Sequence, residues 1–431
     1  MNKKIEVAFV LALLVLVSPV WVESDGYRFI AILLALIGMF LYSKAVEKPP
    51  MPVMGKVGAL WAAFVVGYYI YVKLTHPDAT GGSAEGIYLF PLLYPSIGYF
   101  LYVYRNAFDK IIWAFMIVSF CLLLASISPL DVIEKPLGTR IPILFHKNTI
   151  HASLGAAFIL IASVFFFIWA WKLRPKRVRL AGLFLAASNV IMCLIGIYGS
   201  SSKGVWVSVG VLIFCWAIFS LVLPIRRIFK VAIAGIAICI GVGVFFFLPH
   251  ITNEYVAGNI AGVLKIVQNV GSMDQFSMEA LKATIDQSEL PKNMTVRFHL
   301  WMKAVQIWLM NPVFGMGIYW ENIWVQQSDD YNKFTLVHNG YLSVAMRFGL
   351  VGLLYYGALF IWVTRQIRIC ADRGIIDRLA YYFSFSILSL FLISILTNSN
   401  HRLAIGESFM IAFGAFGFAC HYLCQKQNDK T

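Results

Sequence analysis

Long apolar stretches, separated by short polar connections, recur along nearly the whole chain. Each stretch is close to the roughly 20 residues that a helix needs to cross about 30 Å of hydrocarbon. This pattern predicts an all-α integral membrane protein with about 12 membrane-spanning helices. The expected spans cover residues 6–22, 27–43, 56–74, 87–104, 110–128, 150–171, 180–198, 204–223, 231–248, 337–364, 379–397 and 403–424.

The composition agrees with this pattern. Of the 431 residues, 60% are hydrophobic and 13% are charged, which is too apolar for a soluble domain of this length. The first stretch follows Lys3 and Lys4 as a signal peptide would, but it lacks a small-residue cleavage site, so we interpret it as a retained helix. None of the seven cysteines has the spacing of a metal site, and we expect neither a disulfide nor a metal.

The net charge of +14 is concentrated in alternate short connections between the spans. Lysine and arginine collect on the cytoplasmic side of membrane proteins, so this bias predicts the orientation. Both termini are then cytoplasmic, and the charge gives no reason to expect a nucleic-acid partner. The cytoplasmic connections are expected at residues 44–56, 105–110, 172–179, 226–230 and 365–378.

One long polar segment, residues 249–336, faces outward in this topology and divides the chain into three parts. Residues 1–248 hold spans one to nine, and residues 337–431 hold the last three spans and a short cytoplasmic tail. A loop of this length is usually functional or folded. Residues 296–310 predict an amphipathic helix on the membrane or on the bundle, because six apolar side chains share one face: Val296, Leu300, Trp301, Ala304, Ile307 and Trp308.

The polar residues that stand out all fall on the outward side of this topology. Cations that gather with histidines at the outer leaflet suit a lipid substrate that carries phosphate. These residues are Arg140, His146, His151, the segment GSSSKG at 199–204, Arg297, His338, Asn339, His401 and Arg402.

The segment GSSSKG precedes the eighth span. Ser200 or Ser201 is expected to cap the helix that follows, with Lys203 in its first turn. The unpaired amides of a helix start and the charge of the lysine would together hold a diphosphate oxygen. A capped helix whose lysine extends to the lipid headgroups would explain the same spacing.

Two further residues suit chemistry on phosphate and sugar. Arg297 stands near the start of the amphipathic helix, where its guanidinium would bind phosphate oxygens in a bidentate manner. His338 stands at the outer start of the tenth span, where nearby cations favour the neutral imidazole, which accepts a proton. An interfacial arginine and a hydrogen-bonded cap histidine are the structural alternatives. Further along the span, Arg347 requires a buried acidic or carbonyl partner, while Gly349 and Gly352 are expected to allow close helix packing.

In three segments the chain resembles the O-antigen ligase and polymerase superfamily. These are SSSKGVW from residue 200, RFHLWMKAVQIWLMNPVFGMG from residue 297 and HNGYLSVAMRFGLVG from residue 338. The resemblance extends from about residue 110 to the end of the sequence. The length and the single dominant outward loop are more similar to the O-antigen ligases of lipopolysaccharide assembly than to the protein-glycosylating members.

The resemblance implies a GT-C-type glycosyltransferase bundle with a long periplasmic loop between spans 9 and 10. The implied reaction moves O-antigen polysaccharide from undecaprenyl diphosphate to a sugar hydroxyl of the lipid A core. It takes place at the periplasmic face of the bacterial inner membrane, among membrane lipids, without a metal or other cofactor. We expect a direct displacement that inverts the anomeric centre.

The superfamily motifs also assign roles to individual residues. His338 corresponds to the proposed general base and Arg297 to the arginine that binds the diphosphate. Lys203 stands where the family commonly has arginine, and it keeps the charge but loses the bidentate fork. Four residues are candidates for lesser roles, namely Arg140 and Arg402 for phosphate contacts and Asn339 and Ser202 for support.

Three other functions are weighed against this one. A polymerase of the same superfamily would use the same donor but would extend another lipid-linked glycan. A transporter or flippase for a lipid-linked saccharide would also need many spans and buried charge, but the sequence shows no clear internal repeat. A purely structural role leaves the clustered cations and His338 unexplained.

Overall fold

A computed structural model of the chain describes residues 3–82, 85–128, 130, 134, 140–141, 143–222, 262–266, 268, 277–288, 290–326 and 336–428. These residues are helical apart from their connections and one isolated β-bridge between Val22 and Phe145. The helices are α1 (Lys3–Leu16), η1 (Ser18–Val20), α2 (Gly26–Lys44), α3 (Val53–Thr75), η2 (Glu85–Leu92), α4 (Tyr94–Val103), η3 (Arg105–Ala107), α5 (Phe108–Ser126), α7 (Thr149–Ala170), α8 (Lys176–Ser200), α9 (Lys203–Val222), α12 (Met278–Asp286), α13 (Lys292–Met310), η4 (Gly317–Tyr319), α14 (Trp320–Gln326), α15 (Gly340–Asp372), α16 (Arg378–Thr397), η5 (Asn400–Arg402) and α17 (Ala404–Asn428).

The helical membrane fold is confirmed, but the predicted number of spans is not. Among the described residues, eight helices are long and apolar enough to cross a membrane. The bent pair η2 and α4, which meet at 46°, makes a ninth if it is one span. Helix α1 and the apolar part of α9 are shorter, and the predicted span at 231–248 lies outside the described residues.

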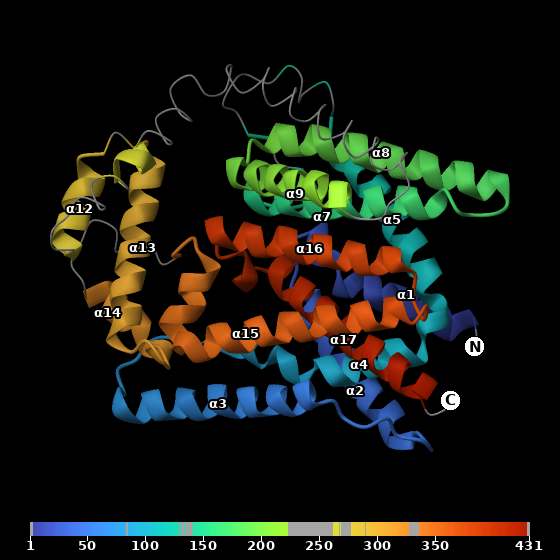
Figure 1. Ribbon diagram of the computed structural model, residues 1–431, viewed down its shortest axis with the longest axis horizontal. Helices are drawn as coiled ribbons and strands as arrows, with labels where there is room; N and C mark the ends of the chain where they lie inside the picture. The colour runs from blue at the N-terminus through green and yellow to red at the C-terminus, as the bar shows by residue number, and fades with distance from the viewer. Residues whose placement is uncertain are drawn as a thin grey trace.

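The long helices run roughly alongside one another, with α3 and α8 on opposite sides and α15, α16 and α17 between them (Figure 1). Both termini lie at one end of this bundle. Helices α12 and α13 lie at the opposite end, where α15 also begins. The outward polar residues predicted from the sequence are therefore brought toward the end that the termini do not occupy.

Helix α13 packs against the bundle through the apolar face that the sequence predicts. Leu300, Ala304 and Ile307 are buried in one hydrophobic cluster with Trp324 of α14 and Met346 of α15. Val296, Trp301 and Trp308 pack against the same cluster, which confirms the predicted face. This contact fixes α13, and with it Arg297, beside the start of α15.

Helix α15 is broken at Gly349, whose backbone adopts φ 57° and ψ −150°. The loop that follows α13 fills the break: the amide of Leu350 donates to the carbonyl of Pro312 at 2.9 Å, and that of Val351 donates to the carbonyl of Val313 at 3.1 Å. Gly349 was expected to allow close helix packing. The segment that it packs against closely is the loop at Val313 and not another helix, and its backbone also adopts a conformation that side chains rarely tolerate.

We expect Gly349→Ala to destabilise the protein. The added Cβ would lie 2.3 Å from the carbonyl oxygen of Val313, and the backbone conformation alone costs roughly 1–3 kcal/mol for a residue other than glycine. The measurement is the apparent melting temperature in detergent. Gly357→Ala is the matched control in the same helix, since no atom lies within 4 Å of its added Cβ. Equal melting temperatures of the two variants would contradict the role given to the break.

Candidate active site

His338 lies in the connection just before α15, and its backbone is left-handed, with φ 52°. Histidine, asparagine and aspartate are the side chains that tolerate this region best. The ring is partly buried, and Nδ1 lies 3.1 Å from Oδ1 of Asn398. Asn398 immediately follows α16, so the contact joins the start of one long helix to the end of another.

The hydrogen bonds of Asn398 determine which nitrogen of His338 carries the proton. Oδ1 of Asn398 also accepts the amide of Ser399 at 3.0 Å, and its Nδ2 donates to Oδ1 of Asn400 at 2.8 Å. The atom that faces His338 is therefore an acceptor, so Nδ1 of the ring must donate. Neutral His338 then carries its lone pair on Nε2, the nitrogen that can accept a proton from a substrate.

Arg297 reaches the same place from α13. Its Nη1 donates to the carbonyl of Thr397 at 2.8 Å, one residue before Asn398. The pKa of His338 lies below its ordinary value, because burial disfavours the charged ring and the positive charge of Arg297 adds to the effect. The bond to Asn398 acts in the opposite direction. The two residues predicted to be base and phosphate ligand are thus brought together, with the base neutral near pH 7.

Arg347 and Arg402 form a second cationic group. Arg347 is fully buried, and its Nε donates to Oε1 of Glu85 at 3.0 Å, which confirms the acidic partner that the sequence requires. Its guanidinium also lies 4.5 Å from the ring centroid of Trp320. Arg402 of η5 is partly buried, and its pKa is lowered by burial and then by the charge of Arg347. Arg402 is therefore close enough to Arg347 for the two positive charges to interact.

The segment around Lys203 differs in part from its prediction. Ser200 is the last residue of α8 and Ser201 is its left-handed C-cap, so the expectation that either caps the next helix is wrong. The reason is that α8 extends to Ser200, so the first two serines of the run end this helix and do not begin the next one. Lys203 is the first residue of α9, as expected, and the structure describes only its backbone. Ser202 is buried between the two helices.

Arg140 and Asn339 have clear positions. Arg140 is exposed, and the next residue, Ile141, donates its amide to the carbonyl of Gly199 at 3.0 Å, which places Arg140 near the connection between α8 and α9. Asn339 is the N-cap of α15, where its Oδ1 accepts the amide of Leu342 at 3.1 Å. Asn339 thus fixes the start of α15 directly after His338.

Sequence reasoning missed Asn398 and Glu85 as parts of this region. The run TNSNHR at 397–402 could have indicated the site. Its amide side chains lie between two spans, where they need hydrogen-bond partners that only the folded end of the bundle supplies. Glu85 carries no such signal in its glycine-rich connection. Its importance depends on the contact with Arg347, which joins residues far apart in the chain.

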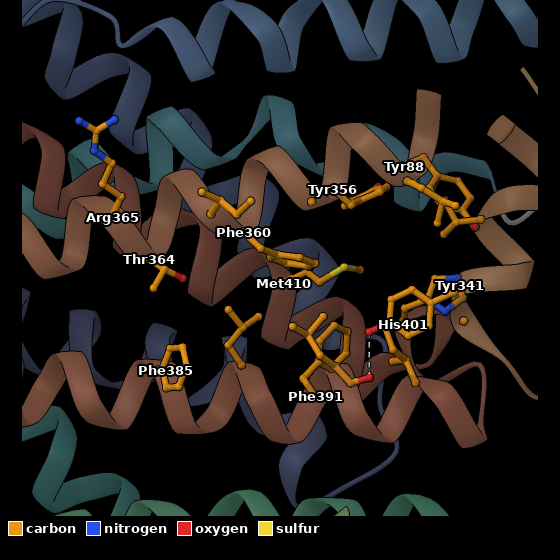
Figure 2. Close-up of a pocket in the computed structure, with 18 of the residues that line it drawn as sticks. Tyr88, Tyr341, Tyr356, Phe360, Thr364, Arg365, Phe385, Phe391, His401 and Met410 are labelled. Atoms are coloured by element: carbon orange, nitrogen blue, oxygen red, sulfur yellow. Dashed lines mark hydrogen bonds between the residues drawn. The ribbon is translucent and has the colours of Figure 1, made fainter. Parts of the chain in front are cut away.

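An apolar cavity of about 570 Å³ adjoins the site, between α15 and α16. Tyr88, Tyr341 and His401 lie at one end of it and Arg365 at the other (Figure 2). Neither ring nitrogen of the buried His401 has a hydrogen-bond partner among the described residues. Ile361, which is 72% exposed, also lines the cavity, so the cavity opens on the surface of the bundle.

The comparison with known families now identifies this fold. Residues 188–357 match a protein-family model described as O-antigen ligase. This match supports membership of the O-antigen ligase and polymerase superfamily. No curated protein matches the chain significantly. The part that matches the family contains Lys203, Arg297 and His338, while Arg140 and Arg402 lie outside it.

Members of this family are glycosyltransferase-like O-antigen ligases and polymerases. The match therefore supports an enzyme of this type that serves O-antigen and lipopolysaccharide biosynthesis. Together with its apolar helices, this makes it a multi-pass membrane protein.

Proposed function

We propose that this protein is an O-antigen ligase, a glycosyltransferase that moves O-antigen polysaccharide from undecaprenyl diphosphate to a sugar hydroxyl of the lipid A core. The observation that carries the proposal is the meeting of His338, oriented by Asn398, with Arg297 from a separate helix. A neutral imidazole beside a guanidinium suits a reaction that removes a hydroxyl proton while a diphosphate departs.

In the proposed mechanism, Nε2 of His338 takes the proton of the acceptor hydroxyl as its oxygen attacks the anomeric carbon of the donor sugar. A new glycosidic bond forms on the face opposite to the departing diphosphate, so the configuration inverts. Arg297 and Lys203 offset the charge that develops on the diphosphate, with Arg402 and Arg140 as further phosphate ligands. The proton then leaves His338 for solvent or product, which restores the neutral base.

We place the lipid carrier of the donor in the cavity between α15 and α16. A polyprenyl chain is apolar and flexible, and the cavity is lined mainly by aliphatic and aromatic side chains and opens on the surface of the bundle. The end at Tyr341 and His401 adjoins Gly340, the first residue of α15 after the His338 segment. A lipid in this cavity would thus present its diphosphate toward the cations of the site.

This placement predicts that Gly357→Leu impairs use of the lipid-linked donor. No atom lies within 4 Å of a Cβ at Gly357, which lines the cavity, so the side chain should fit and occupy space meant for lipid. We expect KM for the polyprenyl donor to rise roughly tenfold, as loss of one or two buried methylenes of contact would produce. Gly67→Leu on α3 is the matched control, since it also has open space but does not line the cavity. Equal KM values in both variants would exclude this cavity as the lipid site.

The experiment that tests the proposed function uses purified protein with a lipid-linked glycan as donor. Lipid A core is supplied as acceptor in one reaction, and only lipid-linked repeat units are supplied in a second. Transfer to lipid A core, detected as a shift on a gel, supports the ligase. Chain growth in the second reaction without transfer in the first would instead assign the polymerase activity, and movement of donor across a vesicle membrane without transfer would assign transport.

We further propose that the end of the bundle holding α13 and the start of α15 faces the periplasm, with both termini in the cytoplasm of a bacterium. The charge bias of the short connections supports this orientation. The division into residues 1–248, 249–336 and 337–431 remains a prediction. The described helices α12, α13 and α14 fall in its middle part.

A further inference from the structure

Three side chains with metal-binding groups gather where the connection between η1 and α2 meets the start of α7. They are Glu23, His146 and His151. One possible ligand atom of each lies within 4.8 Å of those of the other two. Glu23 is exposed, His146 is buried and His151 is intermediate, so the group lies at the edge of the folded bundle rather than free in solvent.

His146 has a hydrogen-bonding requirement that the protein itself does not meet. The ring is only 6% exposed, and its Nε2 lies 3.4 Å from the carbonyl of Val20. Because a carbonyl only accepts, Nε2 must donate, and the lone pair of the neutral ring is then on Nδ1. Nδ1 is buried and has no hydrogen-bond partner in the part of the chain that the structure describes. Histidine metal ligands are commonly oriented in this way: one ring nitrogen donates a hydrogen bond to a backbone carbonyl, and the other nitrogen offers its lone pair to the metal.

The backbone brings Glu23 to the same point. Its amide donates to the carbonyl of Phe145 at 3.4 Å, beside the bridge between Val22 and Phe145. Oε2 of the carboxylate accepts the amide of Lys147 at 3.4 Å, which leaves Oε1 at 4.0 Å from Nδ1 of His151. The two chain segments are therefore joined independently of any ion, and the carboxylate is already directed at the histidines.

The space enclosed is that of a single ion. A pocket of about 40 Å³ is lined by the three side chains and by residues 403–405 at the start of α17. This volume holds an ion with one water molecule. Two imidazoles and one carboxylate are a donor set that zinc accepts, with the fourth position open to water. Tetrahedral zinc needs ligand atoms about 3.4 Å apart, and the Glu23 side chain, 43% exposed, is free to move closer.

We infer that Glu23, His146 and His151 bind one first-row divalent metal ion, Zn²⁺ above all. The ion would fasten the connection before α2 to the start of α7 and fill the pocket against the start of α17. It is not assigned a step in glycosyl transfer, because its ligands are separate from the groups at His338. Magnesium and calcium, which prefer six or more oxygen ligands, should bind poorly to a set with two nitrogens.

The test uses full-length protein carrying a purification tag without histidines, treated with a chelator and then dialysed against Zn²⁺. We expect about one zinc per chain by elemental analysis, and a melting temperature in detergent that rises by several degrees with micromolar Zn²⁺ but not with Mg²⁺. Cobalt in place of zinc should give the visible absorption of a low-symmetry site. Folded wild-type protein that retains less than one tenth of a zinc per chain would overturn the inference.

Variants locate the ion. Glu23→Gln removes one ligand at an exposed position and should weaken zinc binding by at least tenfold, since even outer partners of metal ligands contribute 10–100-fold. His151→Ala should abolish the shift in melting temperature. His421→Ala, on α17 outside the cluster, is the control and should bind zinc as the wild type does. Loss of zinc in this control alone, or equal binding by all variants, would place the metal elsewhere and contradict the assignment.

Discussion

His338→Asn should lower the rate of glycosyl transfer by roughly 10²–10⁴-fold, the usual contribution of a general base, while the protein stays folded. Asparagine tolerates the left-handed backbone at this position, where φ is 52°, so the change removes the base without straining the connection. The amide can still donate toward Asn398, but it cannot take a proton at neutral pH.

The measurement is single-turnover transfer at saturating donor, with folding checked by the elution profile and melting temperature. His421→Ala serves as a histidine control, because that ring belongs to α17 and contacts Gln366 rather than the site. Transfer by His338→Asn within about threefold of the wild type would remove His338 from the role of base. Retention of the anomeric configuration would contradict the single displacement in either protein.

Arg297→Gln should have two separable effects. Loss of one charged donor to the departing diphosphate should lower kcat/KM by roughly 10²–10³-fold. The pKa of His338 should rise as well, because the charge of Arg297 is one of the causes that lower it, after burial. A general base works only when it is unprotonated, so activity falls as the pH decreases through this pKa. The acid limb of the pH profile should therefore move to higher pH in the variant.

The pH dependence of kcat/KM for wild type and Arg297→Gln checks this directly. Lys292→Gln, which removes an exposed charge from the first turn of the same helix, is the matched control. It should leave both the rate and the acid limb nearly unchanged, since exposed charges are screened by solvent. A reduced rate with an unmoved acid limb would mean that Arg297 binds substrate without acting on His338.

Much of the fold could be predicted because lipid imposes a simple rule on sequence. Apolar stretches of sufficient length must be helical, and the bounds of α2, α7, α8 and α16 follow the predicted spans closely. The break at Gly349 could not be predicted in this way. In the sequence, a glycine that breaks a span cannot be told from a glycine that allows helices to pack closely. The break depends on the loop at Pro312 and Val313, which fills it.

The sequence singles out His338 and Arg297 as candidates because the residue type at each position suits the proposed chemistry. The site was not predictable where a partner is defined only by contact. Asn398, which fixes the proton of His338, is one amide among several in its connection. Glu23 and the two histidines of the proposed metal site are separated by more than 100 residues in the chain, so no local spacing indicates them.

The interrupted α15 has a mechanical consequence. After the break, the amides of Leu350 and Val351 donate to the loop that follows α13. Before the break, the carbonyl of Met346 accepts the amide of Met316 from the same loop, so both segments of α15 are tied to it. Any tilt of α13 on arrival of a bulky glycan would be passed to the connection that carries His338. In the proposed mechanism, activation of the acceptor by His338 and neutralisation of the leaving group by Arg297 would then depend on the same helix movement. Neither step would proceed before the other residue is in position.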